Sequence, residues 1–86
     1  MCKIYRVFSK YFEGDKYYDL YGKYGEFYQS NYDCKIKQIE EFQKKHPYYE
    51  YKVLELTKEQ TKRIDENSDI YGIITDDNLY KELFGG

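Results

Sequence analysis

Cys34 and His46 are the two side chains whose types point to covalent chemistry, because a thiolate beside an imidazole is a nucleophile with its own base. His46 is the only histidine, and Cys2 is the only other cysteine. Cys34 and His46 are expected on one helix, separated by about 18 Å at 1.5 Å per residue. They therefore cannot form a dyad. Spacing does not exclude a Cys2–His46 pair, but we favour a solvated histidine at a helix end, so the sequence predicts no catalytic residue.

Carboxylates are the second group with chemical potential. Adjacent pairs occur at Glu40–Glu41, Asp65–Glu66 and Asp76–Asp77. A hydrolase or a metal site would need such pairs to converge in a pocket, and we interpret them as solvated helix faces or helix caps. Two cysteines without a CxxC spacing and a single histidine argue against structural zinc. Gly22 and Gly25 lack the context of a phosphate-binding loop, so no metal and no cofactor are expected.

Tyrosine is the remaining candidate for function. The chain of 86 residues has 13 tyrosines and no tryptophan. Tyrosine joins an apolar ring to a polar hydroxyl and is enriched where proteins bind one another. Four tyrosines are needed least by the expected core and are predicted to contact a partner: Tyr18, Tyr24, Tyr28 and Tyr48. The alternative for any one of them is a ring packed on the fold with its hydroxyl at the edge.

The composition limits the class of protein. The length fits one domain, residues 1–86. A net charge of −2 argues against a general nucleic-acid binder, which needs a basic surplus. Five acidic residues crowd the last third and are predicted to meet a basic surface of a partner: Asp65, Glu66, Asp69, Asp76 and Asp77. With no apolar run near the ~20 residues that span a bilayer, and no visible leader, we expect free thiols and the cytoplasm.

The elements that must position these residues begin with a strand over 3–11, a turn at 13–16 and a second strand over 17–21. This region has an alternative, because several tyrosines follow the spacing of one helix face. They are Tyr17, Tyr21, Tyr24, Tyr28 and Tyr32. Gly22 and Gly25 oppose a helix, so we favour a strand, a glycine-bearing turn and a short extended piece.

The long helix is predicted over about residues 31–46. Ser30 and Asp33 resemble a capping box at its start, and Pro47 ends it. The following strand, 48–56, carries apolar side chains on both faces and is therefore expected at the centre of the sheet.

The rest of the chain is predicted as a helix over about 58–66, a strand over 70–75 and a last helical turn or two. Thr57 with Gln60 caps the first helix, Asp76 or Asp77 caps the second, and Gly85 ends it. The order strand, strand, helix, strand, helix, strand, helix predicts an α+β domain, with a small, mostly antiparallel sheet and the long helix packed across it.

The layout of residues 3–57 resembles small orphan proteins of phages and mobile elements of low-GC bacteria. The resemblance rests on Lys-Ile-Tyr-Arg-Val at 3–7, Gly-Glu-Phe at 25–27, the capped helix and Tyr-Glu-Tyr-Lys-Val at 49–53, in an alanine-free sequence. Some members of that class inhibit bacterial defence nucleases, as anti-CRISPR proteins do. The resemblance implies no catalytic residue.

The sequence therefore predicts a non-enzymatic protein that binds a host protein or complex, such as a nucleic-acid-handling defence complex, and occludes its surface. One alternative is a small enzyme or enzyme subunit with an unrecognised carboxylate site. Another is a single-strand nucleic-acid binder in which tyrosines stack on bases, near Lys16, Lys23, Lys35 and Lys37. Two copies could also pair through an uncovered tyrosine-rich sheet face.

Overall fold

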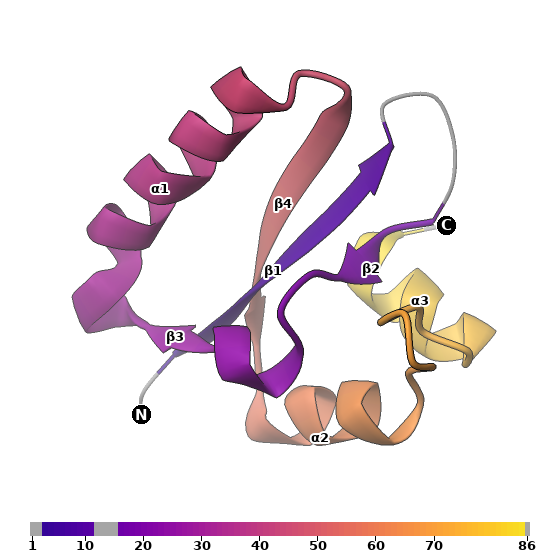
Figure 1. Cartoon of the computed structure of the whole chain (residues 1–86). Helices are drawn as coiled ribbons and strands as arrows, with labels where there is room; N and C mark the ends of the chain where they lie inside the picture. Colours follow the sequence, from indigo (N-terminus) through magenta and orange to yellow (C-terminus); the bar gives the residue numbers. More distant parts are fainter. Residues whose placement is uncertain (1–2, 12–15, 86) are drawn as a thin grey trace.

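The computed structural model of the chain describes residues 3–11 and 16–85 (Figure 1). Its elements are the strands β1 (Ile4–Tyr11), β2 (Tyr18–Asp19), β3 (Phe27–Tyr28) and β4 (Tyr49–Leu56), the 3₁₀ turns η1 (Gly22–Gly25) and η2 (Gln29–Asn31), and the helices α1 (Tyr32–Lys45), α2 (Lys58–Glu66) and α3 (Asp77–Phe84). The strands form one antiparallel four-stranded sheet. The predicted α+β class is confirmed. The turn expected at 13–16 lies almost wholly outside the described residues, as does Cys2.

β1 is the central strand of the sheet. It pairs along its whole length with β4, from Ile4 opposite Leu56 to Tyr11 opposite Tyr49. On its other side it pairs with the short strands β2 and β3. The central position predicted for β4 is wrong, because among the described residues β4 pairs with β1 alone. Both faces of β4 are apolar because helices cover both faces of the sheet.

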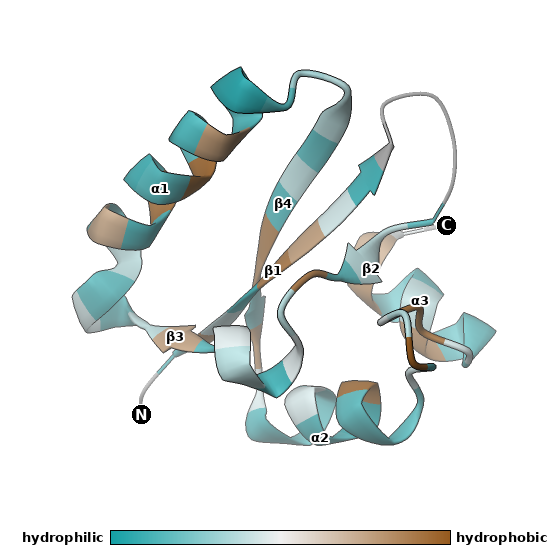
Figure 2. Cartoon of the chain, in the orientation of Figure 1, coloured by the Kyte–Doolittle hydropathy of each residue, from teal (hydrophilic) through white to brown (hydrophobic). Residues whose placement is uncertain are grey.

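The molecule has three layers, with α1 on one face of the sheet and α2 and α3 on the other (Figure 1). Side chains of β1 alternate between the two faces. Phe8 packs with the α2/α3 side, where the buried core is Phe8, Leu56, Ile64, Ile74 and Leu79. Val7 packs toward α1, in a smaller cluster of Tyr5, Val7 and Phe27. Figure 2 shows the apolar side of α1 turned toward the sheet, although α1 contributes no buried residue.

The segment 17–28 follows the favoured prediction rather than the helical alternative. It forms β2, then η1, then β3. Gly22 has φ = 61°, a left-handed conformation that glycine adopts without steric cost and that would break an α-helix at this point.

Two predictions about local structure are wrong. Ser30 does not cap the long helix, because it lies within η2, and the N-cap is Asn31 without a side-chain hydrogen bond. Residues 70–75 do not form a strand; they contribute two isolated bridges, Ile73 with Tyr18 and Ile74 with Ser68. Gly72, with φ = 83°, turns the chain there and prevents a continuous ladder.

The predicted helix ends were more accurate. Thr57 and Gln60 form a complete capping box, each side chain bonding the other residue's backbone N–H. Asp76 accepts hydrogen bonds from two backbone N–H groups at the start of α3, and Gly85 ends that helix with φ = 75°. α1 ends at Lys45, and its C-cap His46 lies directly before Pro47. Within the described residues, each helix is too short or too polar to cross a membrane.

Candidate functional site

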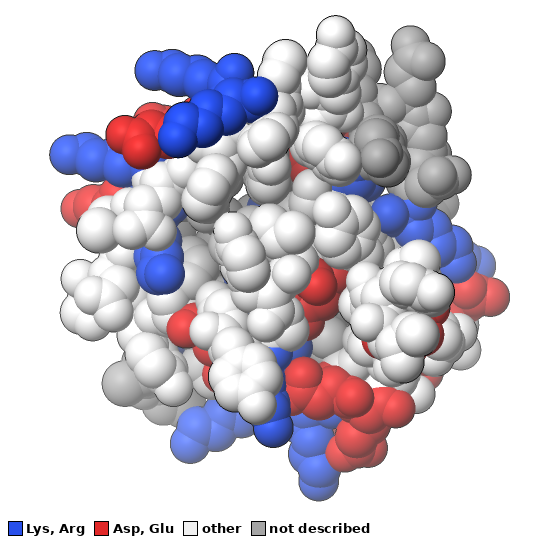
Figure 3. Space-filling model, viewed as in Figure 1, with Lys and Arg blue, Asp and Glu red and all other residues white. Residues whose placement is uncertain are grey.

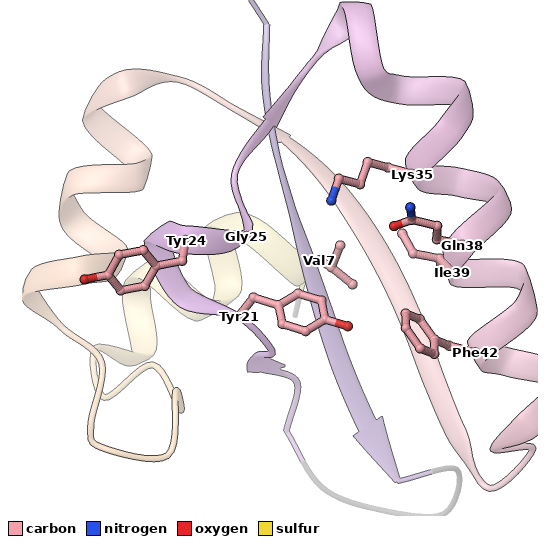
Figure 4. A pocket seen from close by; sticks show the side chains of 8 residues that line it. All are labelled: Val7, Tyr21, Tyr24, Gly25, Lys35, Gln38, Ile39 and Phe42. Atoms are coloured by element: carbon pink, nitrogen blue, oxygen red, sulfur yellow. The ribbon is translucent and has the colours of Figure 1, made fainter.

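A hollow of about 330 Å³ lies between α1 and η1, above β1 (Figure 4). It is lined by Val7, Tyr21, Tyr24, Gly25, Lys35, Gln38, Ile39 and Phe42. The four α1 residues have the spacing i, i+3, i+4, i+7, which places them on one face of a helix. Their counterparts come from η1 and the residue before it, so the hollow exists only because the chain folds η1 over the sheet.

Tyr21 forms one wall of this hollow, and its position depends on Gly25. A Cβ atom at Gly25 would lie 2.4 Å from the Cβ of Tyr21, so only glycine permits this approach. The ring of Tyr21 points toward the side of Phe42, whereas Tyr24 points away from the hollow (Figure 4). Tyr24 is 90% exposed, and the amine of Lys23 lies 5.6 Å from its ring centre.

A second hollow of about 350 Å³ adjoins the first and shares Tyr21 with it. Its lining includes Asp69, Ile70 and Tyr71 from the loop between α2 and α3. Ile70 and Tyr71 are 91% and 73% exposed. The Asp69 carboxylate holds this loop by accepting hydrogen bonds from the backbone N–H groups of Tyr71 (2.8 Å) and Ile73 (3.0 Å). The exposure of these side chains is therefore built into an ordered turn.

These two hollows together define a surface that we call the aromatic face, made by Tyr21, Tyr24, Phe42, Ile70 and Tyr71. Figure 3 views this side of the molecule and shows a broad uncharged area across its middle, with lysines gathered toward the outer side of α1. Exposed large apolar side chains gathered beside hollows are typical of a binding surface.

Arg6 holds both ends of the segment that carries Tyr21 and Tyr24. Its side chain is fully buried, and Nη1 donates hydrogen bonds to Asp19 (2.9 Å) and Asp65 (3.0 Å). Nη2 donates to Glu26 (2.6 Å) and to the second oxygen of Asp65 (3.0 Å). Asp19 precedes η1 and Glu26 follows it, so one guanidinium fixes the turn to β1 and to α2.

The electrostatics of this cluster favour a structural role. Burial alone would lower the pKa of Arg6, but its hydrogen bonds with Asp65 and Glu26 raise the pKa well above its usual range. Burial raises the pKa of Asp19, against the opposing effect of Arg6. The carboxylates of Asp19, Glu26 and Asp65 converge, as they would in an enzyme that uses carboxylates. All three are bound to the guanidinium of Arg6, which is permanently charged. The sequence analysis does not name Arg6 as a site residue. Its place on the same strand face as Ile4 and Phe8 was the available signal, because an arginine buried on an apolar face needs ionic or hydrogen-bonding partners.

The four predicted tyrosines do not lie together. Tyr24 borders the α1–η1 hollow, with its ring directed away from it (Figure 4). Tyr18 is half-buried in β2, and Tyr28 lines a separate hollow beside Lys3. Tyr48 is 76% exposed in the turn after α1.

Tyr21 and Tyr71 were not predicted as site residues. The sequence places Tyr21 in a strand over 17–21, but β2 ends at Asp19. It places Tyr71 in a strand over 70–75, which does not form. Their exposure depends on turns whose geometry is set by contacts distant in the sequence.

Each predicted acidic residue is engaged within the chain. Asp65 binds Arg6, and Glu66 lies 3.9 Å from Lys62. Asp69 and Asp76 accept backbone hydrogen bonds, and Asp77 lies 3.2 Å from Lys16. Asp65 and Asp69 line the same hollow. These partners explain the positions of the carboxylates without an external ligand.

Cys34 is exposed and unpaired near the start of α1, while His46 lies at its end with its ring 6.2 Å from that of Tyr49. In the part of the chain that the structure describes, no cluster of three or more His, Cys, Asp or Glu side chains is placed to hold a metal ion. Comparisons of the chain with protein-family models, curated proteins and solved structures gave no match.

Proposed function

We propose that this chain acts by binding another protein through the aromatic face, without catalysing a reaction. The observation that carries the proposal is the position of Tyr21, which is shared by two adjoining hollows rimmed by exposed apolar side chains. Tyrosine is enriched among the side chains that anchor protein interfaces, where such anchors cluster in well-packed pockets. A monomer gains nothing in stability from exposing Ile70 and Tyr71 on an ordered loop.

In the proposed mode, an apolar side chain of the partner enters the α1–η1 hollow. Val7 and Ile39 would contact its tip, and Tyr21 and Phe42 would contact its sides (Figure 4). The amine of Lys35 points toward the hollow (Figure 4) and would pair with a carboxylate next to that side chain. The volume of about 330 Å³ is at the small end for drug-sized ligands and suits a single side chain.

The narrower proposal is that the bound protein is a nucleic-acid-handling defence protein of a bacterial cell, and that binding in the cytoplasm occludes it. Its support is the resemblance of residues 3–57 to phage and mobile-element proteins. Because the five acidic residues already have partners in the chain, we expect salt to weaken this binding only modestly.

The test begins with a photo-crosslinking amino acid, benzoylphenylalanine, placed at Tyr24 and, in a separate protein, at Tyr28. Both proteins are expressed in bacterial cells and irradiated, and the crosslinked protein is identified by mass spectrometry. We expect a discrete product from position 24 and none from position 28. Discrete crosslinks from position 28 alone would contradict the proposed face.

The captured protein is then purified and titrated against the unmodified chain by calorimetry. Tyr21 and Tyr28 are each 47% exposed, so Tyr21→Ala and Tyr28→Ala are matched variants. Tyr21→Ala should weaken binding by about 2 kcal/mol or more, as an interface anchor does, and Tyr28→Ala by less than about 0.5 kcal/mol. Equal losses would refute the assignment of the aromatic face.

A further inference from the structure

Lys35 is a half-buried cation that has no ion-pair partner among the described residues. The other basic side chains that are buried or half-buried in this part of the chain each bind a carboxylate: Arg6, Lys10 and Arg63. Removing a charge from water without giving it a partner has a cost in free energy. An anion supplied by another molecule would offset that cost at Lys35.

The surroundings of the Lys35 amine are apolar. Figure 4 shows the amine pointing toward the α1–η1 hollow, where it lies on the same helix face as Ile39 and Phe42. Lys35 is the only charged residue among the described residues that line this hollow. The hollow therefore offers one cation beside apolar walls, which suits an apolar group that carries a negative charge.

We propose that the α1–η1 hollow receives the C-terminal residue of a partner polypeptide. Its apolar side chain would pack against Ile39 and Phe42, and its terminal carboxylate would pair with Lys35. The amide of Gln38, which also lines the hollow, can donate a second hydrogen bond to that carboxylate. This inference rests on the proposed function and names the part of the partner that is bound.

The position of Lys35 favours a carboxylate on the same residue that fills the hollow. Lys35 and Ile39 are four residues apart on α1, about 6 Å along the helix axis, and a terminal residue spans this distance because its carboxylate and side chain share one Cα. In an extended segment, adjacent side chains point to opposite faces, so an acidic neighbour of an internal apolar residue would point away. An acidic residue two positions along lies about 7 Å from the apolar one and would have to be ordered as well.

The experiment is a titration of the whole isotope-labelled chain with small probes, followed by two-dimensional NMR. N-acetylleucine carries both groups, N-acetylleucinamide lacks the charge, and N-acetylglycine lacks the apolar side chain. We expect N-acetylleucine to bind with a dissociation constant on the order of 1 mM, as its size allows, and to shift the amide signals of Gly25 and Ile39. Each of the other two probes should bind at least about tenfold more weakly. N-acetylphenylalanine and its amide are measured in parallel, because an apolar hollow discriminates only modestly between apolar side chains.

The role of the cation is tested by two variants. Lys35→Gln removes the charge from the hollow, so the acid and its amide should then bind equally weakly. Lys37→Gln is the matched control, because Lys37 is exposed and residues two positions apart on a helix do not share a face. It should keep the preference for the acid. Circular dichroism establishes that both variants are folded.

The outcomes separate this inference from the proposed function, which the crosslink at position 24 and the Tyr21→Ala titration test independently. If an acid and its amide bind the hollow equally, the hollow accepts apolar groups without recognising a chain end, and only this inference is wrong. It is also overturned if neither acid binds well above the expected dissociation constant, or if the two lysine variants behave alike. Equal binding of acetyl-Leu-Gly-Asp-amide, whose carboxylate is not terminal, would assign Lys35 to internal acidic residues instead.

Discussion

The two sides of the sheet are packed differently. On the α2/α3 side, Ile64 and Leu79 are fully buried although their helices have only nine and eight residues. On the α1 side, a helix of fourteen residues buries none of them. The hydroxyl of Ser9 is buried without a hydrogen-bond partner among the described residues. The α2/α3 side therefore supplies most of the core, and the α1 side leaves the α1–η1 hollow unfilled by side chains of the described residues.

Helix length does not explain this difference. α2 and α3 are held close to the sheet by residues that interdigitate with Phe8 and Leu56. α1 contacts the sheet mainly through Tyr32 and Ile39, and Ile39 and Phe42 of its second half border the hollow that lies between α1 and η1 (Figure 4). Removing a methyl group from a closely packed region lowers the free energy of unfolding more than removing it beside an open hollow. Matched substitutions on the two sides of the sheet should therefore differ in their cost.

The largest effect should come from Arg6→Met, which leaves three carboxylates around an empty cation position. Breaking a buried ion cluster by removing one partner costs about 3–5 kcal/mol, enough to unfold a small domain. Urea denaturation followed by circular dichroism measures the loss. Lys10→Met is the control on the same strand, since its single ion pair is partly exposed and should cost less than about 1 kcal/mol. Similar costs for the two variants would contradict the role assigned to Arg6.

A matched pair of smaller changes compares the two sides directly. Ile64→Val removes one methyl group from the packed side and should cost about 1 kcal/mol. Ile39→Val removes the same group beside the hollow and should cost less than about 0.5 kcal/mol, because the surroundings are already open. Chemical denaturation of both proteins under one set of conditions gives the difference. A larger cost for Ile39→Val would reverse the comparison.

The smallest effect is a pH dependence on the α1 side. Burial raises the pKa of Tyr51 above the ordinary 10.0, and the phenols of Tyr18 and Tyr21 add to the shift. The folded chain therefore keeps this proton at a pH where the unfolded chain loses it. The resulting stabilisation is complete below about pH 10 and is lost as the pH rises through the folded-state pKa.

Tyr51→Phe removes that contribution, so its free energy of unfolding should fall less steeply than that of the wild type between about pH 9 and 11. Tyr24→Phe changes an exposed phenol and serves as the control. Parallel pH profiles for the wild type and Tyr51→Phe would show that the partial burial of Tyr51 does not raise its pKa.

Local sequence signals predicted most elements correctly. Thr57 with Gln60, Asp76, Pro47 and Gly85 act through bonds and dihedral angles within a few residues, so their effects can be read without knowing the fold. The strand expected at 70–75 and the cap expected at Ser30 do not form, because turns at these positions hold the backbone in other conformations.

The candidate site was harder to predict because its parts are distant in sequence. Tyrosine excess indicated a binding surface, but Tyr24 alone among the four predicted tyrosines borders the aromatic face. Tyr21 and Tyr71 become neighbours of one hollow only after Gly72 packs against Asp19. Composition specifies how many rings exist and leaves open which of them remain outside.

The sequence by itself determined the α+β class, the strand β1, the ends of most helices and the surplus of aromatic side chains, because hydrophobic alternation, capping and proline act over a single turn or strand. Only the tertiary structure decided that β4 lies at an edge, that Arg6 binds three carboxylates, and that one side of the sheet stays open. Those outcomes depend on contacts between residues that are distant in the sequence. Whether a charge is buried or a strand lies at an edge is set by its neighbours in space, and a local sequence pattern does not specify them.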